Sequence, residues 1–192
     1  MTDFFVPAAL VAVCAVMAGC ATSTTTTTLT PSPQSPVCDA AGSALVLWTA
    51  QWRADQKDVP ERTAAAHAGL QAFFASSGCF AKSELRRLPS VAPAVIAAEV
   101  ASVNGQYGKI VTIALRELGP TVKLLSSAAL IDGTTEAQFQ VVEYTMPWPY
   151  HRREFTVHWQ EGGPGVIKGV ASLPQDLQAA LVAGLQTGVR SH

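Results

Sequence analysis

The chain of 192 residues carries 13 Lys and Arg against 14 Asp and Glu, and its formal net charge is −1 at pH 7. A nearly neutral chain lacks the basic excess that attracts nucleic acid or an acidic polymer. Its length suits one domain large enough to bury a substantial core. The composition therefore argues against a nucleic-acid partner and favours a single globular domain.

The first apolar segment, residues 4–19 (FFVPAALVAVCAVMAG), is shorter than the about 20 residues that a transmembrane helix needs. Its length and its small terminal residues are typical of the apolar region of an export signal. The stretch VMAGC, Val16–Cys20, resembles the lipobox of bacterial lipoproteins. In that motif an aliphatic residue and two small residues precede a cysteine that is diacylated on sulfur and becomes the new N-terminus. The resemblance implies a lipid anchor at Cys20.

Two features depart from the lipobox pattern: Met17 stands where leucine is usual, and Asp3 stands near a start where Lys or Arg is expected. The alternative is an ordinary secreted protein that is cut near Ala18 or Ala21. Two or three acyl chains anchor a protein stably, because each buried methylene contributes about 0.8 kcal/mol and one chain alone holds only marginally. In lipoproteins of this kind, Ala21 after the cysteine implies delivery to the outer membrane.

A tract of Thr, Pro and Ser follows the cysteine. Residues 21–36 (ATSTTTTTLTPSPQSP) contain almost no apolar surface to bury, so the tract is expected to stay disordered and to act as a tether. The predicted organisation is therefore a signal peptide (1–19), a lipid-anchored disordered tether (20–37) and a single periplasmic α/β domain (38–192).

Four cysteines divide by position: Cys14 lies in the signal segment, Cys20 in the lipobox-like motif, and Cys38 and Cys79 in the mature domain. In an exported protein, Cys38 and Cys79 are expected to form a disulfide. The alternative is a thiol nucleophile or a metal ligand, although no second ligand lies nearby in the sequence.

The first half of the domain alternates predicted strands and helices. The strands cover 44–53, 79–88 and 109–118, and the first places Val46 and Trp48 on one face at a period of two. A helix follows DVPE, in which Asp58 is expected to cap the helix and Glu61 to complete a capping box, and a second helix begins after Ser90. This order predicts a parallel start built from right-handed crossover units.

The second half replaces helices with turn signals. Gly119-Pro120, Asp132-Gly133 and Gly162–Gly165 predict tight turns between antiparallel strands near 121–131, 135–145, 152–160 and 165–170. Ser172 is expected to start a C-terminal helix. The predicted fold class is α/β, with a β-α-β-α-β start, an antiparallel β-meander, a C-terminal helix, and a mixed sheet whose helices lie mainly on one face.

This element order, and the phrase GLQAFFASSGCFAKSELRR in particular, resembles envelope lipoproteins of the TolB amino-terminal-domain type. That group includes the curli-secretion lipoprotein, the penicillin-binding-protein activators and the auxiliary lipoproteins of lipid-transporting ABC systems. The resemblance spans most of residues 44–187 and is one of topology. It implies a non-enzymatic adaptor.

Two polar stretches are candidate sites. His151, Glu154 and His158 would make a metal site, but on a strand Glu154 and His158 lie about 13 Å apart, so a solvated face is favoured. DQKDVPER, residues 55–62, lies beyond the carboxyl end of the first strand, where open α/β sheets tend to bind ligands. Asp55 and Lys57 mark that cleft, and the alternative is a solvated loop that leads into a capped helix.

The stretch MPWPYHRR, residues 146–153, combines aromatic and cationic side chains between prolines. Such a combination is enriched at protein contacts and at interfaces with lipid headgroups. The predicted partner-binding residues are Trp148, Tyr150, Arg152 and Arg153. The alternative is that Trp148 folds back and plugs the open end of the sheet.

From these observations we expect an outer-membrane-anchored periplasmic lipoprotein that acts as a non-enzymatic adaptor or accessory subunit of an envelope assembly or transport system. The expected partners are the membrane, through the acyl chains, and an envelope protein. We expect no catalytic residue, cofactor or metal. The alternative is a small-molecule or glycan-binding envelope lipoprotein that uses the cleft at residues 55–62.

Overall fold

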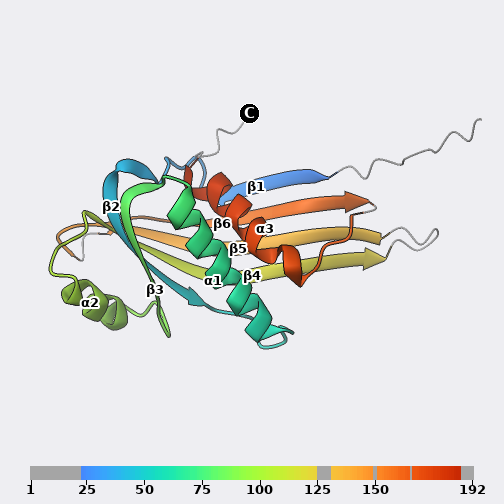
Figure 1. The fold of residues 1–192 in the computed structure, drawn as a ribbon, viewed down its shortest axis with the longest axis horizontal. Helices are drawn as coiled ribbons and strands as arrows, with labels where there is room; N and C mark the ends of the chain where they lie inside the picture. The colour runs from blue at the N-terminus through green and yellow to red at the C-terminus, as the bar shows by residue number, and fades with distance from the viewer. Residues whose placement is uncertain (1–22, 125–130, 149–150, 165, 187–192) are drawn as a thin grey trace, which may run out of the picture.

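The computed structural model describes residues 23–124, 131–148, 151–164 and 166–186. Within these residues the chain forms one six-stranded sheet in the order β1-β6-β5-β4-β2-β3 (Figure 1). The strands are β1 (Thr24–Thr30), β2 (Asp39–Ala50), β3 (Phe80–Arg87), β4 (Lys109–Leu124), β5 (Ile131–Thr145) and β6 (His151–Pro164). The helices are α1 (Val59–Ser76), α2 (Pro93–Ser102) and α3 (Leu173–Leu181), and one π turn (Val182–Gln186) continues α3.

The sheet has a parallel half and an antiparallel half, as the sequence predicts. Strand β2 pairs in parallel with both β3 and β4, and α1 and α2 provide the connections. Strands β4, β5 and β6 pair antiparallel in chain order, and β1 adds to the free side of β6. The predicted mixed α/β fold is therefore confirmed.

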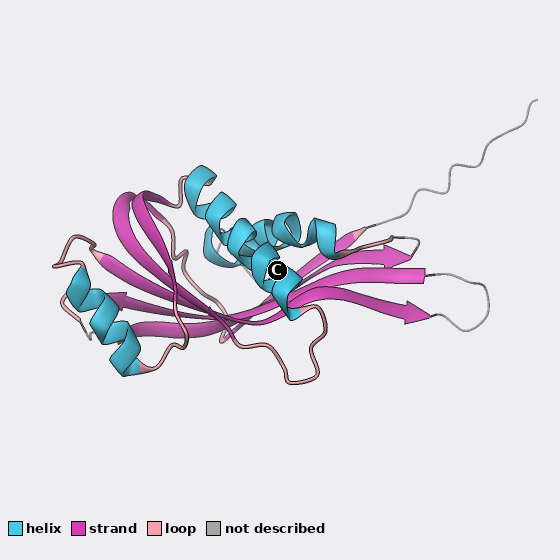
Figure 2. Cartoon of the chain, turned by 60° about the horizontal axis from the view of Figure 1, so that its bottom comes forward, coloured by secondary structure: helices cyan, strands magenta, loops and turns pink. Residues whose placement is uncertain are grey.

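The helices cover the two faces of the sheet unequally. Figure 2 shows α1 and α3 on one side and α2 alone on the other. The face under α1 and α3 carries the larger core, whose biggest fully buried side chains are Trp48, Phe73, Phe139, Phe155 and Trp159. A smaller core under α2 contains Leu45, Leu47, Ile96, Val100 and Ile110. The face opposite α1 and α3 is thus covered only over the parallel half.

The disulfide between Cys38 and Cys79 is present. It joins the residues that precede β2 and β3, and the Asp39 amide donates to the Cys79 carbonyl at 2.8 Å beside it. The bond therefore fastens the starts of two neighbouring parallel strands.

The prediction of a disordered tether over 20–37 is wrong for the described part of that tract. Thr24–Thr30 form the edge strand β1, which pairs with β6 from Thr24 opposite Gly162 to Thr30 opposite Thr156. Leu29 is 3% exposed in the larger core. Threonine is β-branched and suits a strand, and an edge strand needs only backbone partners and one apolar anchor. Counting apolar residues could not reveal this pairing.

The predicted turns at Gly119 and Gly133 are wrong, because strands run through both positions. At the third predicted turn, β6 continues through Gly162 to Pro164, and the Val166 amide then donates to the Gly163 carbonyl at 3.1 Å in a turn. Gly119 lies inside β4, Gly133 inside β5 and Gly162 inside β6. A side chain at Gly133 would place its Cβ 2.2 Å from the Val166 carbonyl oxygen, and one at Gly162 would lie 2.2 Å from the Gly133 oxygen. Gly133 and Gly162 therefore permit close approach of neighbouring backbone.

Two predicted strands change accordingly. The strand expected near 121–131 is divided between the end of β4 at Leu124 and the start of β5 at Ile131, and residues 125–130 lie outside the described part of the chain. The strand expected at 165–170 is absent from its described residues, 166–170, which lead into one 3-10 turn at Val170–Ser172.

The helix starts differ from the predicted caps. Asp58 takes a left-handed backbone conformation with φ 55°, and its side chain makes no capping hydrogen bond. Helix α2 has Ala92 at its cap position, and the Ser90 hydroxyl accepts a weak bond of 3.4 Å from the Ala92 amide. Ser172 stands at the cap of α3 but donates to Asp176 instead of accepting from a helix amide. Proline in the first turn remains the common start signal.

Candidate functional site

The predicted contact loop and the start of β1 lie at opposite ends of the sheet. The stretch 146–153 connects β5 to β6 near α2, whereas β1 begins where β4 ends, β5 begins and β6 ends (Figure 1). Tyr150 lies outside the described residues, as does the side chain of Arg152. Of the four predicted contact side chains, the structure therefore describes those of Trp148 and Arg153.

Trp148 is half-buried. Its ring centroid lies 4.5 Å from that of Tyr144, and both rings pack against the smaller core under α2. Burial raises the pKa of the Tyr144 hydroxyl above its ordinary value. One side of the indole is thus held by the sheet and α2, while the rest of the ring remains accessible at the end of the molecule.

Arg153 is engaged inside the protein. Its Nε lies 2.5 Å from an oxygen of Glu143, whose side chain is fully buried, and the Lys109 ammonium lies 2.6 Å from the other oxygen. Arg153 also donates to the carbonyls of Ser35 and Pro36. This buried cluster therefore fastens the segment between β1 and β2 to the sheet. Glu143 and Lys109 are not among the residues predicted from the sequence, although an acid at core-face spacing from Val141 is a signal for such a cluster.

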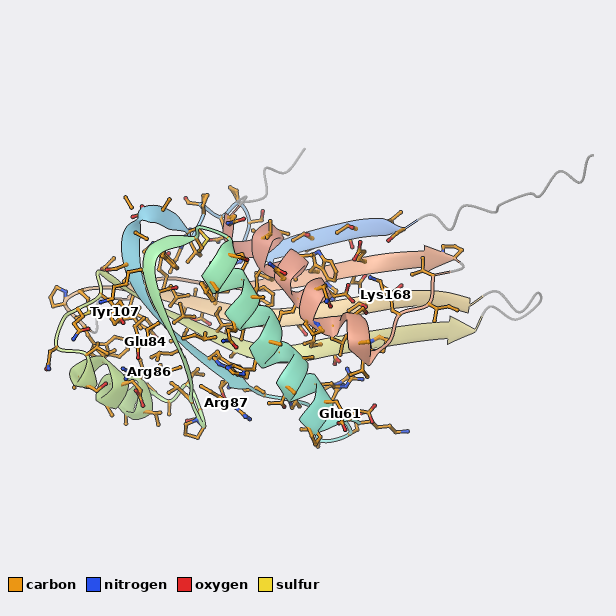
Figure 3. All side chains as sticks on the ribbon, viewed as in Figure 1. Glu61, Glu84, Arg86, Arg87, Tyr107 and Lys168 are labelled. Carbon is orange, nitrogen blue, oxygen red and sulfur yellow. A yellow bond between two sulfur atoms is a disulfide. The ribbon has the colours of Figure 1, made fainter. Side chains whose placement is uncertain are left out.

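A second network holds α2 against β3. The Tyr107 hydroxyl donates to Glu84 at 2.5 Å, and Arg86 donates to Glu84 and to Glu99 of α2 at 2.7 and 2.8 Å (Figure 3). The bonds from Tyr107 and Arg86 hold the pKa of Glu84 below its ordinary value. The same bond to Glu84 raises the pKa of the Tyr107 hydroxyl.

The region predicted from residues 55–62 contains a hollow of about 750 Å³, called here the edge hollow. It lies where β2 ends and β4 continues alone on that side. Asp55 has an 82% exposed side chain, and neither Asp55 nor Lys57 lines the hollow. Its lining consists of Gln51, Arg53, Gln56, Arg62, Arg116, Glu117, Pro120, Glu136 and Gln138. The stretch 55–62 therefore borders a hollow, to which it contributes Gln56 and Arg62 instead of Asp55 and Lys57.

One wall of the edge hollow is an ion cluster around Glu117. The Arg53 guanidinium lies 3.0 Å from this carboxylate and that of Arg62 lies 3.7 Å away, and the Gln56 amide donates to it at 3.2 Å. Arg62 is buried; it also donates to the carbonyl of Lys57 at 2.8 Å and to that of Leu118. Arg62 therefore satisfies a carbonyl on the edge of β4 that no strand pairs.

Two irregularities in β4 create the space for this cluster. A β-bulge between Leu115 and Glu117 shifts the register against β5. Bulges redirect side chains and occur frequently beside functional sites. A Cβ at Gly119 would lie 1.5 Å from the Arg62 guanidinium, so only glycine fits there. Neither the bulge nor the role of Gly119 follows from the local sequence.

Arg116 differs from the other two arginines of the edge hollow. Its guanidinium is exposed and donates to the Gln140 side chain at 3.0 Å, and it forms no ion pair within the described part of the chain. Gln140 in turn donates to Glu154. On the same wall, Glu136 is paired with His158 at 2.6 Å.

Among the described side chains, which include those of Glu154 and His158 but not that of His151, no group of three His, Cys, Asp or Glu residues could hold a metal ion. Within the same described ranges, no helix is long and apolar enough to cross a bilayer. His67 is exposed and stacks on Trp48, with ring centroids 5.9 Å apart. It therefore covers part of the larger core.

Comparison with known proteins gives structural likenesses at low identity. No family model and no curated protein matches the sequence. A solved PelC dodecamer from Paraburkholderia phytofirmans is 12% identical with a TM-score of 0.45, over 88% of this chain and 100% of that chain. The lipoprotein GNA1162 from Neisseria meningitidis is 15% identical with a TM-score of 0.39, over 74% and 96%. Protein XCC0632 from Xanthomonas campestris is 13% identical with a TM-score of 0.38, over 80% and 83%.

Proposed function

We propose that the protein is an outer-membrane-anchored periplasmic lipoprotein that acts as a non-enzymatic adaptor or accessory subunit of an envelope assembly or transport system. The observation that supports this proposal is the position of β1. Thr24, its first residue, follows Cys20 by four residues and is already paired with Gly162. Four residues span at most about 14 Å, so an acylated Cys20 would hold this end of the sheet close to the bilayer.

The same pairing gives the domain an orientation. The end near Thr24 contains the end of β6 and the start of β5, since Thr134 pairs with Gly162. Strand β5 has 15 residues and extends roughly 45 Å from there toward Thr145. Trp148, three residues farther on, would stand well away from the headgroups. A protein partner is therefore favoured over lipid as the contact of Trp148.

An exposed apolar residue lies at the end near Thr24. Ile167 is 84% exposed, in a segment that passes Gly133 of β5. Its neighbour Lys168 holds the segment in place through Glu161 at 3.1 Å and Asp176 at 2.9 Å (Figure 3). Although burial opposes its charge, these two carboxylates raise the pKa of Lys168 above its ordinary value. An isoleucine presented on a fixed segment beside the anchor suits contact with the bilayer surface.

The anchor is tested by fractionating cells that express Cys20→Ala. This variant is expected to move to the soluble periplasmic fraction, while the matched Cys14→Ala variant stays with the membranes. Unchanged partitioning of Cys20→Ala into the detergent phase would contradict the anchor.

The adaptor role is tested by in-cell photo-crosslinking from an unnatural residue at position 148, with a matched probe at the exposed Arg87. One dominant envelope protein captured at 148 and not at 87 is the expected result. If neither position captures a protein, the adaptor role fails.

A further inference from the structure

We infer that the edge hollow is a binding site for a small molecule that carries both a carboxylate and hydroxyl groups, such as a uronic acid. This site goes beyond the adaptor role, which does not require a ligand there. Its volume of about 750 Å³ falls within the range of small-molecule pockets, roughly 300–1,000 Å³.

The charges of the hollow leave one cation for a ligand. Three guanidinium groups line the hollow, those of Arg53, Arg62 and Arg116, against two carboxylates, those of Glu117 and Glu136. Glu117 is shared by Arg53 and Arg62. Arg116 contacts no carboxylate among the described residues; its bond to Gln140 is to a neutral amide. A guanidinium presents donors in a fixed fork that fits a carboxylate. The ligand is therefore expected to be an anion.

The amides of the hollow supply the second part of the recognition. Gln51 and Gln138 line it, and neither side chain forms a hydrogen bond within the described ranges of the chain. An amide side chain both donates and accepts, as a sugar hydroxyl does. A ligand with hydroxyls beside its carboxylate would use Arg116 and these two amides together.

The construction of β4 argues that this arrangement is built into the fold. The bulge places Arg116 and Glu117 next to each other at the hollow instead of on opposite faces of the strand. The position of Glu117 is explained by the edge of β4, where it pairs with Arg62 and Gly119 leaves room for the Arg62 guanidinium. Arg116 takes no part in this contact, because the bond to the Leu118 carbonyl on the edge of β4 comes from Arg62. A ligand explains why the same bulge also directs Arg116 to this place.

The test is saturation-transfer NMR on the full chain in detergent, with D-glucuronate as the probe and D-glucose and acetate as controls. Glucuronate is expected to bind with a Kd on the order of 1 mM, which is typical of a ligand with about 13 non-hydrogen atoms. Glucose, which lacks the carboxylate, and acetate, which lacks the hydroxyls, are expected to bind at least tenfold more weakly.

Two charge-matched variants locate the site. Arg116→Gln is expected to weaken glucuronate binding about tenfold, because a charge-assisted bidentate contact is lost. Lys57→Gln removes the same charge from the neighbouring loop, outside the hollow, and is expected to bind as the parent does. Gln138→Ala, which leaves the charge unchanged, is expected to weaken binding as well.

Three outcomes would overturn the site: glucose binding as well as glucuronate, acetate binding as well as glucuronate, or no effect of Arg116→Gln and Gln138→Ala. Circular dichroism shows whether each variant is folded before it is titrated. The experiment involves no partner protein, so its failure would leave the adaptor role unaffected, and failure of the cross-linking experiment would leave this site unaffected.

Discussion

The parallel and antiparallel halves of the sheet are buried in different ways. In β2 the residues from Leu45 to Trp48 are all fully buried, because α1 covers one face and α2 the other. In β5, Ala137, Phe139 and Val141 are buried, whereas the alternate residues stay partly exposed. The difference indicates that the parallel half supplies stability on two faces. The antiparallel half keeps one polar face available for binding.

Removal of the disulfide in the parallel half is expected to lower the stability of the domain more than any other change considered below. Replacing both Cys38 and Cys79 with serine should lower the free energy of unfolding by about 4 kcal/mol, since the bond closes a loop with a sequence separation of 41. Urea denaturation of the oxidised parent and of the double variant measures this. A loss below about 1 kcal/mol would mean that the antiparallel half sets the stability of the domain.

The next comparison sets a fully buried position in the parallel half against a partly exposed position in the antiparallel half. Leu47→Ala in β2 should cost about 3 kcal/mol, the typical cost of deleting a fully buried leucine. Thr156→Ala, at a partly exposed position of β6, should change stability by less than about 0.5 kcal/mol. Chemical denaturation of both variants tests the contrast, and equal losses would contradict it.

A methyl group at Gly119 probes the boundary between the halves. Gly119→Ala should cost about 2 kcal/mol, because its Cβ overlaps the Arg62 guanidinium and would separate it from Leu118. Gly169→Ala is the matched control, since no atom lies within 4 Å of the Cβ it would add. Thermal unfolding distinguishes the two, and a tolerated Gly119→Ala would contradict the described position of Arg62.

The smallest change in stability is expected for a substitution of Glu84, which lies where α2 packs on the parallel half. Its pKa is lowered in the folded protein, so its contribution to stability is present above the ordinary value of 4.5 and is lost as the pH falls through the folded value. Glu84→Gln should therefore lower Tm at neutral pH and approach the parent Tm in acid. Tyr107→Phe should reproduce part of this profile. A difference in Tm that is independent of pH would contradict the assignment.

The sequence predicted the parallel half better than the antiparallel half for a physical reason. Apolar runs such as ALVLW and helices that begin at proline depend on burial and local backbone preference, and both are visible in the chain. The strand β1 and the glycines at 119, 133 and 162 depend on partners more than 25 residues away. Thr and Gly at these positions resemble linker and turn residues until the distant strand is known.

The lining of the edge hollow also depends in part on residues that are distant in the sequence. The rule that ligands bind beyond the carboxyl ends of strands indicated residues 55–62, and two of the lining residues, Gln56 and Arg62, come from that stretch. Arg116 and Gln138 come from β4 and β5 and reach the hollow through a bulge and strand pairing. Side-chain chemistry alone could not bring them together.

The most direct test of the orientation uses two photo-crosslinking positions in cells labelled with radioactive phospholipid. A probe at Ile167, next to the end of the sheet where β1 begins, is expected to capture phospholipid. A probe at Trp148, at the opposite end, is expected to capture protein and no lipid. Lipid captured at 148 and not at 167 would show that the domain stands the other way round, and it would contradict the account.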